Sequence, residues 1–220
     1  MIAGLYPYVR GGEAHPPRVT LEEVPASLAI NPSYRHDLVV LAGDRASADQ
    51  LAAFGLRAAR IFEDAPDHVC RDMAHKMKHW MCRWALEEFG EFLWVDWDTV
   101  LLRPPDTEFW NWCRTHDTPK FIQIAGYWAV VNCGVYYCGH SWAQAIDRSF
   151  SAVVRRPNDE LLWASVLPDD VHSRPEFWWG SRAVNIWSPD DFAVVGTGTY
   201  FAHVRHLEWA PELRRLATLD

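Results

Sequence analysis

Short apolar runs alternate with amphipathic segments along the first part of the chain. The run at 37–43 predicts a buried strand that ends at a Gly-Asp turn. Residues 47–54 have helical spacing, and 56–62 return to a strand pattern. Residues 1–9 predict a first strand. This strand–helix–strand order favours a parallel sheet.

The longest predicted helix runs over 67–89. Its apolar residues recur at steps of three and four, and Gly90 stands where a C-terminal cap belongs. Two strands are expected next, a fully apolar one at 92–95 and a second at 99–102.

The second half of the chain predicts a mixture of helices and strands. Helices are expected at 106–116, 141–154, 157–166 and 208–219, and strands at 121–125, 127–137, 192–195 and 199–204. Residues 168–189 are turn-rich and aromatic. The pattern predicts a single α/β domain with a central, mostly parallel sheet flanked by helices.

Composition narrows the class of protein. The chain has 220 residues, of which 49% are apolar and 23% charged, as in an ordinary globular protein. With 29 acidic and 21 basic side chains the net charge is −8, which argues against a general polyanion binder. No apolar run reaches the roughly 18 residues of a membrane span, so we expect no stable membrane insertion. The N-terminus carries no pattern of a secretion signal, and the five cysteines form no CxxC pair, so a cytoplasmic protein with reduced thiols is expected.

The strongest chemical signal is Asp96-Trp97-Asp98, directly after the apolar strand at 92–95. Two carboxylates at a strand end cannot both enter a dry core without a large cost in free energy. A turn there can aim both at one hard cation, which prefers oxygen ligands and commonly holds substrate phosphates. The carboxyl end of a strand is also where ligands bind in open α/β sheets.

With its flanks, this segment resembles the nucleotide-sugar-dependent glycosyltransferases of the GT-A fold, and most of all their retaining families. The matching features are, in chain order, Lys76 or Lys78, Arg83, Gly90, the 92–104 block, Asn132-Cys133-Gly134, Asn158-Asp159-Glu160 and His203. The two lysines point about 200° apart on a helix, so at most one faces the site, and Lys78 has nearly the expected spacing.

The resemblance implies a Mn²⁺ (or Mg²⁺) ion on the donor diphosphate. Asp98 and His203 would be direct ligands, and Asp96 would contact the ion, directly or through water, or the ribose. His206 is a rival of His203 for the third position. The donor-binding residues implied are Tyr8, Lys78, Asp96, Trp97 and Asn132.

Asp159 and Glu160 are the catalytic candidates of the resemblance. One of these carboxylates would face the anomeric carbon or orient the acceptor hydroxyl. The competing interpretation is structural, because acidic residues at a helix start also cap free N–H groups.

The resemblance implies transfer from a UDP-sugar with retention, and we favour same-face attack over a covalent nucleophile. Residues 1–105 would form the nucleotide-sugar half and 106–220 the acceptor half. The acceptor stays open between a saccharide, a protein and, as a minority option, a hydroxylated DNA base. The aromatic region with Trp178, Trp179 and Trp187 is the expected acceptor-side surface.

Two other functions compete. Asp96 and Asp98, helped by Asp44, could belong to a metal-dependent phosphohydrolase or nuclease, although such enzymes need further converging ligands. A non-catalytic module that binds a sugar or nucleotide on its aromatic rings is the third possibility.

Overall fold

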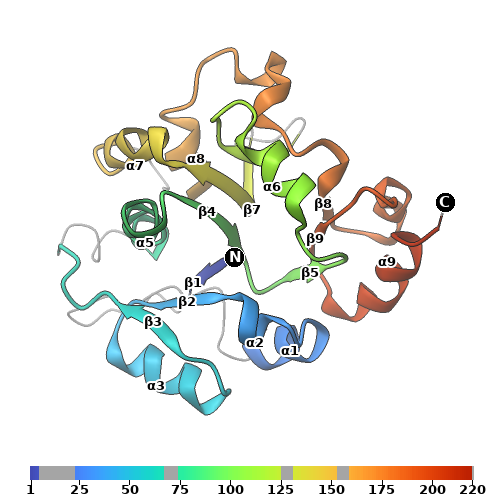
Figure 1. Cartoon of the computed structure of the whole chain (residues 1–220), viewed down its shortest axis with the longest axis horizontal. Coiled ribbons are helices and arrows are strands. Elements are labelled where there is room, and N and C mark those ends of the chain that lie inside the picture. The colour runs from blue at the N-terminus through green and yellow to red at the C-terminus, as the bar shows by residue number, and fades with distance from the viewer. Residues whose placement is uncertain (5–22, 67–73, 125–130, 153–158, 220) are drawn as a thin grey trace.

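The strands form a large and a small sheet. The computed structural model describes residues 1–4, 23–66, 74–124, 131–152 and 159–219. The large sheet has six strands in the order β3-β2-β1-β4-β7-β6, and the small one has three in the order β5-β9-β8 (Figure 1). The strands are β1 Ile2–Gly4, β2 Val39–Ala42, β3 Ala58–Ile61, β4 Glu91–Val95, β5 Thr99–Leu101, β6 Lys120–Gln123, β7 Val131–Gly139, β8 Ala183–Ile186 and β9 Phe201–Val204.

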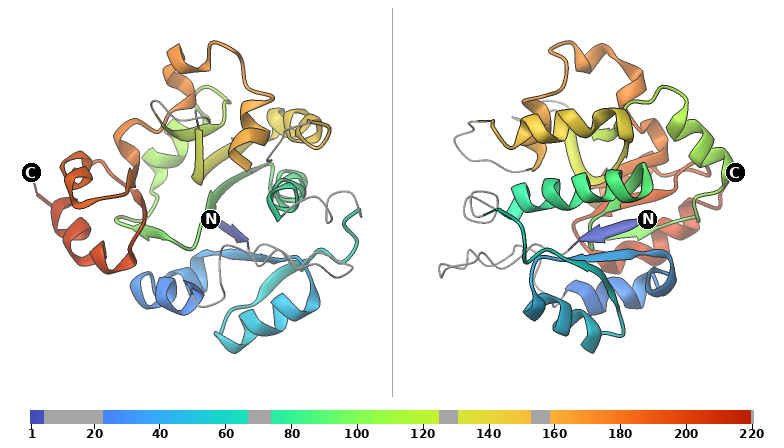
Figure 2. Two further views of the ribbon diagram at one scale, coloured as in Figure 1. Left: turned by 180° about the vertical axis from the view of Figure 1, so that it is seen from behind. Right: turned by 60° about the vertical axis from the view of Figure 1, so that its left-hand side comes forward.

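The large sheet confirms the predicted α/β class with a mostly parallel sheet. Its β3, β2, β1 and β4 pair in parallel, and β7 is antiparallel to both β4 and β6. The strand–helix–strand unit predicted over 37–62 is present as β2, α3 and β3, and β1 lies in the middle of the molecule (Figures 1 and 2).

Helices cover the large sheet on both faces. The α-helices are α1 Glu23–Ile30, α2 Tyr34–Asp37, α3 Arg45–Ala53, α5 Ala74–Phe89, α6 Thr107–Arg114, α7 Ala143–Ser149, α8 Asp159–Ala164 and α9 Ala210–Leu216. The short 3₁₀ helices are η1 His140–Trp142, η2 Val171–Ser173, η3 Pro175–Phe177, η4 Gly180–Arg182, η5 Pro189–Val194 and η6 Leu207–Trp209. As predicted, α5 stops at Gly90, whose φ of 76° is in the left-handed region.

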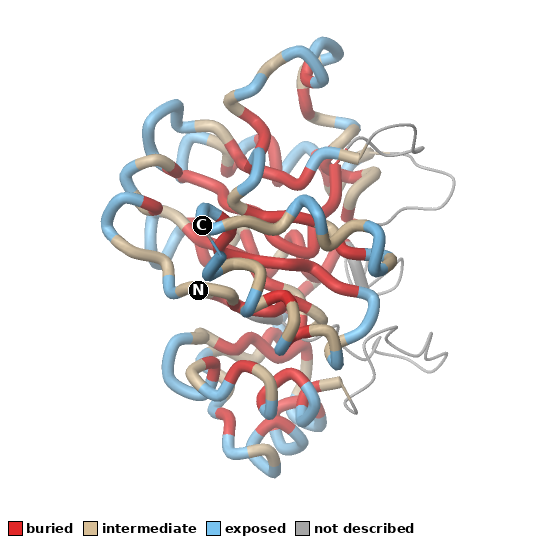
Figure 3. Tube along the Cα trace, turned by 90° about the vertical axis from the view of Figure 1, so that its right-hand side faces the viewer, coloured by how far each residue is buried: buried red, intermediate tan, exposed pale blue. Residues whose placement is uncertain are grey.

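Alternation along β4 separates two cores. Phe92 and Trp94 pack with residues of α5, α7 and α8, whereas Leu93 and Val95 pack with residues of α1, α3 and α6. This is the period of two that a strand imposes when both of its faces are covered. Every residue of β7 and four of the five residues of β4 are accordingly buried. In the whole trace, buried residues lie in the interior and exposed ones on the outer turns (Figure 3).

The small sheet continues directly from the large one. Three residues separate the end of β4 from the start of β5. β9 and β8 join β5 on the side of the molecule away from α5 and α7 (Figure 1). A third core of Val100, Val184, Ile186, Ala202, Val204, Ala210 and Leu213 fills the space between this sheet and α9.

Several sequence predictions need correction. Residues 192–195, expected as a strand, mostly belong to the 3₁₀ helix η5, because Ser188 and Asp191 form a capping box and Pro189 opens the turn. The strand β8 lies inside 168–189, a region described from the sequence as turn-rich and for which no strand was predicted. Residues 5–9, 67–73, 125–130 and 153–158 of the predicted elements lie outside the described residues.

The expected aromatic surface is mostly core. Trp178 and Trp179 are buried, and the indole Nε1 of Trp179 donates a hydrogen bond to the carbonyl oxygen of Val135 at 2.9 Å. Trp187 alone of the three is exposed, with 49% of its surface accessible. Within the described part of the chain, every helix is too short or too polar to cross a bilayer.

A buried amide joins the first helices to the small sheet. Asn31 follows α1 and is 2% exposed. Its Nδ2 donates to the carbonyl oxygen of Thr99 at 2.8 Å, and its Oδ1 accepts from the backbone N–H of Leu101 at 3.0 Å. The side chain therefore satisfies two polar groups at the edge of β5, the strand that follows Asp98.

We predict that Asn31→Leu lowers the free energy of unfolding by about 1–3 kcal/mol, because it leaves the backbone N–H of Leu101 buried without its partner. The carbonyl oxygen of Thr99 keeps only the hydroxyl of Tyr34 as a donor, at 3.2 Å. Urea denaturation measures the loss. The matched control is Asn111→Leu at an exposed position of α6, for which a change within about 0.5 kcal/mol is expected. Equal stability of the two variants would contradict the role given to Asn31.

Candidate active site

Asp96, Asp98 and His203 meet at the junction of the two sheets. Asp96 follows β4, and its backbone N–H donates to the carbonyl oxygen of Gly134 at 2.8 Å. Asp98 precedes β5, and the pairing of Thr99 with His203 brings β9 alongside. One ligand atom from each of the three side chains lies within 4.8 Å of the others. The three residues predicted as metal ligands are therefore neighbours in space.

His203 is held from two sides. Its Nδ1 lies 2.9 Å from the Oδ1 of Asn185 on β8, an acceptor, so Nδ1 carries a proton. Its Nε2 lies 3.2 Å from the Oδ1 of Asp98. Burial lowers the pKa of His203, but the charge of Asp98 and its hydrogen bond outweigh burial, so the pKa is raised overall. Nε2 faces the two carboxylates in the orientation that a metal ligand needs.

The contact between β7 and β9 depends on Gly134. A Cβ on Gly134 would lie 2.5 Å from two carbon atoms of the His203 ring, closer than any real contact allows. Asn132 stabilises the same strand segment, because its Oδ1 accepts from the backbone N–H of Gly134 at 3.0 Å. Its Nδ2 donates to the Oε1 of Glu160 at 3.1 Å. The Asn-x-Gly pattern thus leaves room for the imidazole and connects it to the acidic start of α8.

Lys78 is the buried cation of the site. Its Nζ donates to the Oδ2 of Asp159 at 2.6 Å, to the Oδ1 of Asp96 at 3.0 Å and to the carbonyl oxygen of Cys133 at 2.9 Å. Only 1% of its side chain is exposed. Of the two candidate lysines, Lys78 is the one whose ammonium group bonds the acids of the site. It brings α5, β4, β7 and α8 to one point.

The carboxylates around this point have shifted pKa values. Burial raises the pKa of Asp96, and the charge of Lys78 opposes that shift only in part. Burial also tends to raise the pKa of Asp98, but the charge and hydrogen bond of His203 outweigh burial and lower this pKa. Asp98 is therefore the carboxylate of the pair that is ionised most readily.

Glu160 and Glu23 are further acids near the cluster. Burial, followed by the charge of Asp159, raises the pKa of Glu160 to about 7. Burial, followed by the charges of Asp98 and Asp96, raises the pKa of Glu23 to about 7 as well. Sequence analysis missed Glu23, because no motif or spacing connects the start of α1 with the carboxyl end of β4.

The donor set fits a divalent cation. Two carboxylates and one imidazole combine the oxygen ligands of Mn²⁺ and Mg²⁺ with a nitrogen that Mn²⁺ tolerates better than Mg²⁺ does. The proton on Nδ1 leaves the Nε2 lone pair for the ion when the imidazole is neutral. The side chains that would hold the ion are Asp96, Asp98 and His203.

The remaining predicted residues lie at different places. Tyr8 is outside the described residues. Trp97 is 1% exposed and packs in the core that contains Leu93 and Val95. Its contact with the donor stays a prediction. The rival His206 is exposed and pairs with Glu208 at 3.4 Å, away from the cluster. Asp44 caps α3 by accepting from the backbone N–H of Ser47, and it is not part of the cluster of Asp96, Asp98 and His203.

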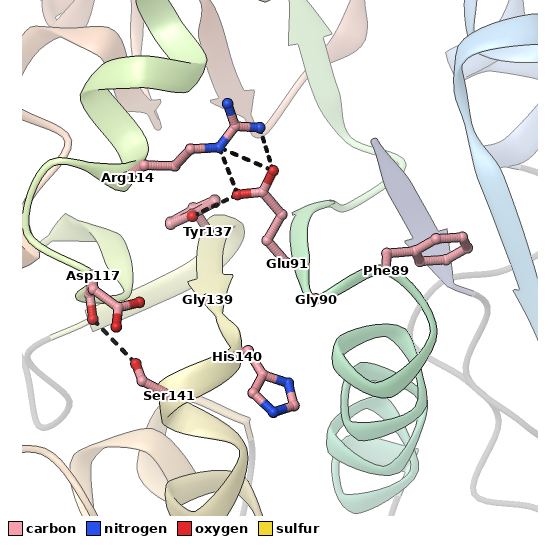
Figure 4. Close-up of a pocket in the computed structure, with 9 residues that line it drawn as sticks. All are labelled: Phe89, Gly90, Glu91, Arg114, Asp117, Tyr137, Gly139, His140 and Ser141. Carbon is pink, nitrogen blue, oxygen red and sulfur yellow. Dashed lines mark hydrogen bonds and ion pairs between the residues drawn. The ribbon is translucent and has the colours of Figure 1, made fainter.

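A surface pocket lies at the opposite end of β4. Its volume is about 710 Å³, and Glu91, Arg114, Tyr137 and His140 are among the residues that line it (Figure 4). The Oε2 of Glu91 accepts from Arg114 Nε at 2.9 Å and from the Tyr137 hydroxyl at 2.8 Å. The pocket shares no residue with the cluster of Asp96, Asp98 and His203.

Comparison with solved structures finds glycosyltransferases. One is a glycosyltransferase involved in the glycosylation of the major capsid of PBCV-1, with 14% identity, a TM-score of 0.49 and coverage of 97% of this chain and 98% of that one. Another is the galactosyltransferase LgtC with donor and acceptor sugar analogues, with 14% identity, a TM-score of 0.47 and coverage of 100% and 97%. An active-site mutant of LgtC matches at 13% identity and a TM-score of 0.47, with the same coverage.

No protein-family model matches the chain, and no curated protein matches it in sequence.

We predict that Lys78→Met lowers the free energy of unfolding by about 3–5 kcal/mol, because it leaves buried acids without their cation. The pKa of Asp96 is already raised above its usual 3.8 and rises further in the variant. A raised pKa in the folded state stabilises the protein at low pH and loses that effect as the pH increases. The deficit should therefore grow from about pH 4 upward. Urea denaturation across this range measures it.

The control for Lys78→Met is Arg83→Met on the same helix. Arg83 pairs with Asp147 at 2.8 Å and Glu87 at 2.7 Å on the surface, so a loss of at most about 1 kcal/mol is expected. A deficit in Lys78→Met that is small and constant with pH would show that Lys78 does not neutralise the buried acids.

A second prediction concerns the packing of β7 against His203. Gly134→Ala should cost about 1–3 kcal/mol of stability, because the added methyl group forces the imidazole out of place. Gly196→Ala is the control, since a Cβ there has no atom within 4 Å. Chemical denaturation of both variants tests the difference, and a Gly134→Ala protein as stable as the control would refute the close approach.

Proposed function

We propose that this chain is a metal-dependent glycosyltransferase that moves a sugar from a nucleotide-sugar donor to an acceptor hydroxyl. The observation that carries the proposal is the meeting of Asp96, Asp98 and His203 beside the Lys78–Asp159 pair, at the carboxyl end of β4. Ligands of open α/β sheets bind at this end of the strands.

Asp96, Asp98 and His203 would hold Mn²⁺ or Mg²⁺, and the ion would supply positive charge to the departing diphosphate. The protein residues fix the geometry. Asn185 orients the His203 ring, and Lys78 together with the indole of Trp94 holds Asp96, whose Oδ1 lies 2.6 Å from the Trp94 Nε1. Such fixed ligands cost little reorganisation when charge develops.

The acids of α8 would act on the sugar side. Lys78 neutralises Asp159 through a 2.6 Å contact, which suits an orienting residue better than a covalent nucleophile. Glu160, held by Asn132, is able to accept a hydrogen bond from a hydroxyl when it is ionised. We therefore infer same-face attack with retention: the acceptor oxygen bonds to the anomeric carbon, the bond to the diphosphate breaks, and the hydroxyl proton moves to the departing diphosphate.

The donor in this proposal is a UDP-sugar, with UDP-glucose and UDP-galactose as the first to test. Residues 1–105 would bind most of the nucleotide sugar. The donor-contacting set would be Tyr8, Lys78, Asp96 and Trp97 from this half, together with Asn132 from β7. The acceptor would bind over 106–220, and a saccharide, a protein and a hydroxylated DNA base remain the candidate classes. Four buried free thiols, at Cys82, Cys113, Cys133 and Cys138, support a reducing, cytoplasmic location.

The test is release of UDP from UDP-glucose and UDP-galactose, with Mn²⁺ or with a chelator and no added acceptor. We expect metal-dependent release, and a loss of at least about 100-fold in Asp98→Asn and in His203→Ala. His206→Ala is the matched control, because His206 lies on the surface, and it should act like wild type. Proton NMR of the freshly released sugar, read before it mutarotates, should show the α-anomer.

Several outcomes would contradict the proposal. A folded Asp98→Asn protein with near-wild-type release would remove the metal role of Asp98. A loss of UDP release in His206→Ala but not in His203→Ala would assign the metal ligand to His206. A freshly released β-anomer would exclude retention.

A further inference from the structure

Trp187 stands out among the tryptophans of the described residues because its ring is largely exposed. The side chain is 49% accessible, and it belongs to none of the three cores. A tryptophan buries 150–250 Å² when covered, so about half of that gain is unused here. A ligand that covers this ring would gain binding free energy from the apolar surface that it buries.

The backbone at Trp187 is fixed. Its N–H donates to the Oδ2 of Asp191 at 2.8 Å, and the N–H of Ser188 donates to the same oxygen at 2.9 Å. Ser188 and Asp191 also form the capping box of η5. The ring is thus presented from the end of β8 by a turn that is already ordered, which lowers the entropic cost of binding.

Trp187 contacts the candidate metal site. Its ring lies at 83° to the ring of His203, with centroids 5.6 Å apart. Asn185, two residues earlier on the strand, bonds the Nδ1 of the same histidine. The end of β8 therefore supplies both the side chain that orients His203 and an exposed aromatic ring next to it.

Two sides of the cluster can be distinguished. Asp96 contacts Lys78, and Lys78 contacts Asp159, whereas His203 contacts Asn185 and Trp187. Trp187 and its supporting turn belong to 106–220, the half to which the proposed function gives the acceptor. A pyranose presents a face of C–H groups that packs on an aromatic ring, and it carries no charge that the acids nearby would repel.

We propose that Trp187 is the stacking surface for a pyranose ring of the acceptor, held next to the metal-bound diphosphate. This rests on the proposed function and names the acceptor class as a saccharide. A stacked nucleobase or donor sugar is the outcome that the experiment must separate from it.

The experiment uses the whole chain with UDP and Mg²⁺. Calorimetry measures UDP binding, and saturation-transfer NMR measures binding of methyl β-D-glucopyranoside and methyl β-D-galactopyranoside to the UDP complex. We expect at least one glycoside to bind, Trp187→Ala to weaken it about tenfold, and Trp187→Phe to retain most of it. UDP affinity should stay within about twofold in both variants.

Phe89→Ala is the matched control. Phe89 is exposed to nearly the same extent, 48%, but lies at the opposite end of β4 in the pocket of Figure 4. This variant should bind both probes like wild type.

The two proposals fail differently. If wild type binds UDP neither with Mg²⁺ nor, in a second calorimetric titration, with Mn²⁺, the proposed UDP-sugar transferase and this inference are both overturned. If UDP binds but neither glycoside does, or if Trp187→Ala binds the glycosides as wild type does, this inference alone is overturned. A Trp187→Ala protein that loses UDP affinity instead would assign the ring to the nucleotide sugar or to the support of His203.

Discussion

The candidate site depends on one buried ammonium group. Lys78 donates three hydrogen bonds, to Asp159, Asp96 and a backbone carbonyl of β7, and each acceptor comes from a different part of the chain. Without this cation, Asp96 and Asp159 would be buried close together with no positive charge, and their pKa values would rise until at least one of them is protonated. Lys78 keeps negative charge available in the site while the domain stays folded.

A second constraint is steric. β7 and β9 approach so closely at Gly134 and His203 that the imidazole occupies the volume of a missing side chain. The ring is then bounded by β7 in front, Asn185 at its Nδ1 and Trp187 on its flank. The groups that bound the His203 ring come from β7 and from β8 with its C-terminal end, so the geometry of the cluster is part of the fold.

The parts of the site that depend on neighbouring residues in the chain were predicted from the sequence, and some of the parts that depend on distant segments were not. The Asp96-Trp97-Asp98 turn was predictable because it directly follows a strand of four apolar residues, 92–95. The choice of Lys78 over Lys76 depended on helical geometry, because residues two positions apart on a helix point in different directions. Asn185 and Glu23 were not predictable, because β8 is a four-residue strand inside a turn-rich region and the start of α1 carries no motif. At 192–195 the apolar residues suggested a strand, but the capping chemistry of Ser188 and Asp191 decided the local structure.

The topology also sets an order on the assembly of the protein during synthesis. β9 is the middle strand of the small sheet, between β5 and β8, so neither neighbour has a partner in that sheet until Val204 has been made. The Asp-Trp-Asp turn and Lys78 are translated far earlier, and the large sheet contains no strand that comes after β7. A growing chain therefore contains every strand of the large sheet while Asp98 still lacks its histidine, although the core that includes Trp179 and Phe201 is not yet filled. His203 joins Asp96 and Asp98 only when β9 has been made, so a chain that ends before β9 lacks the cluster although all strands of its large sheet are present.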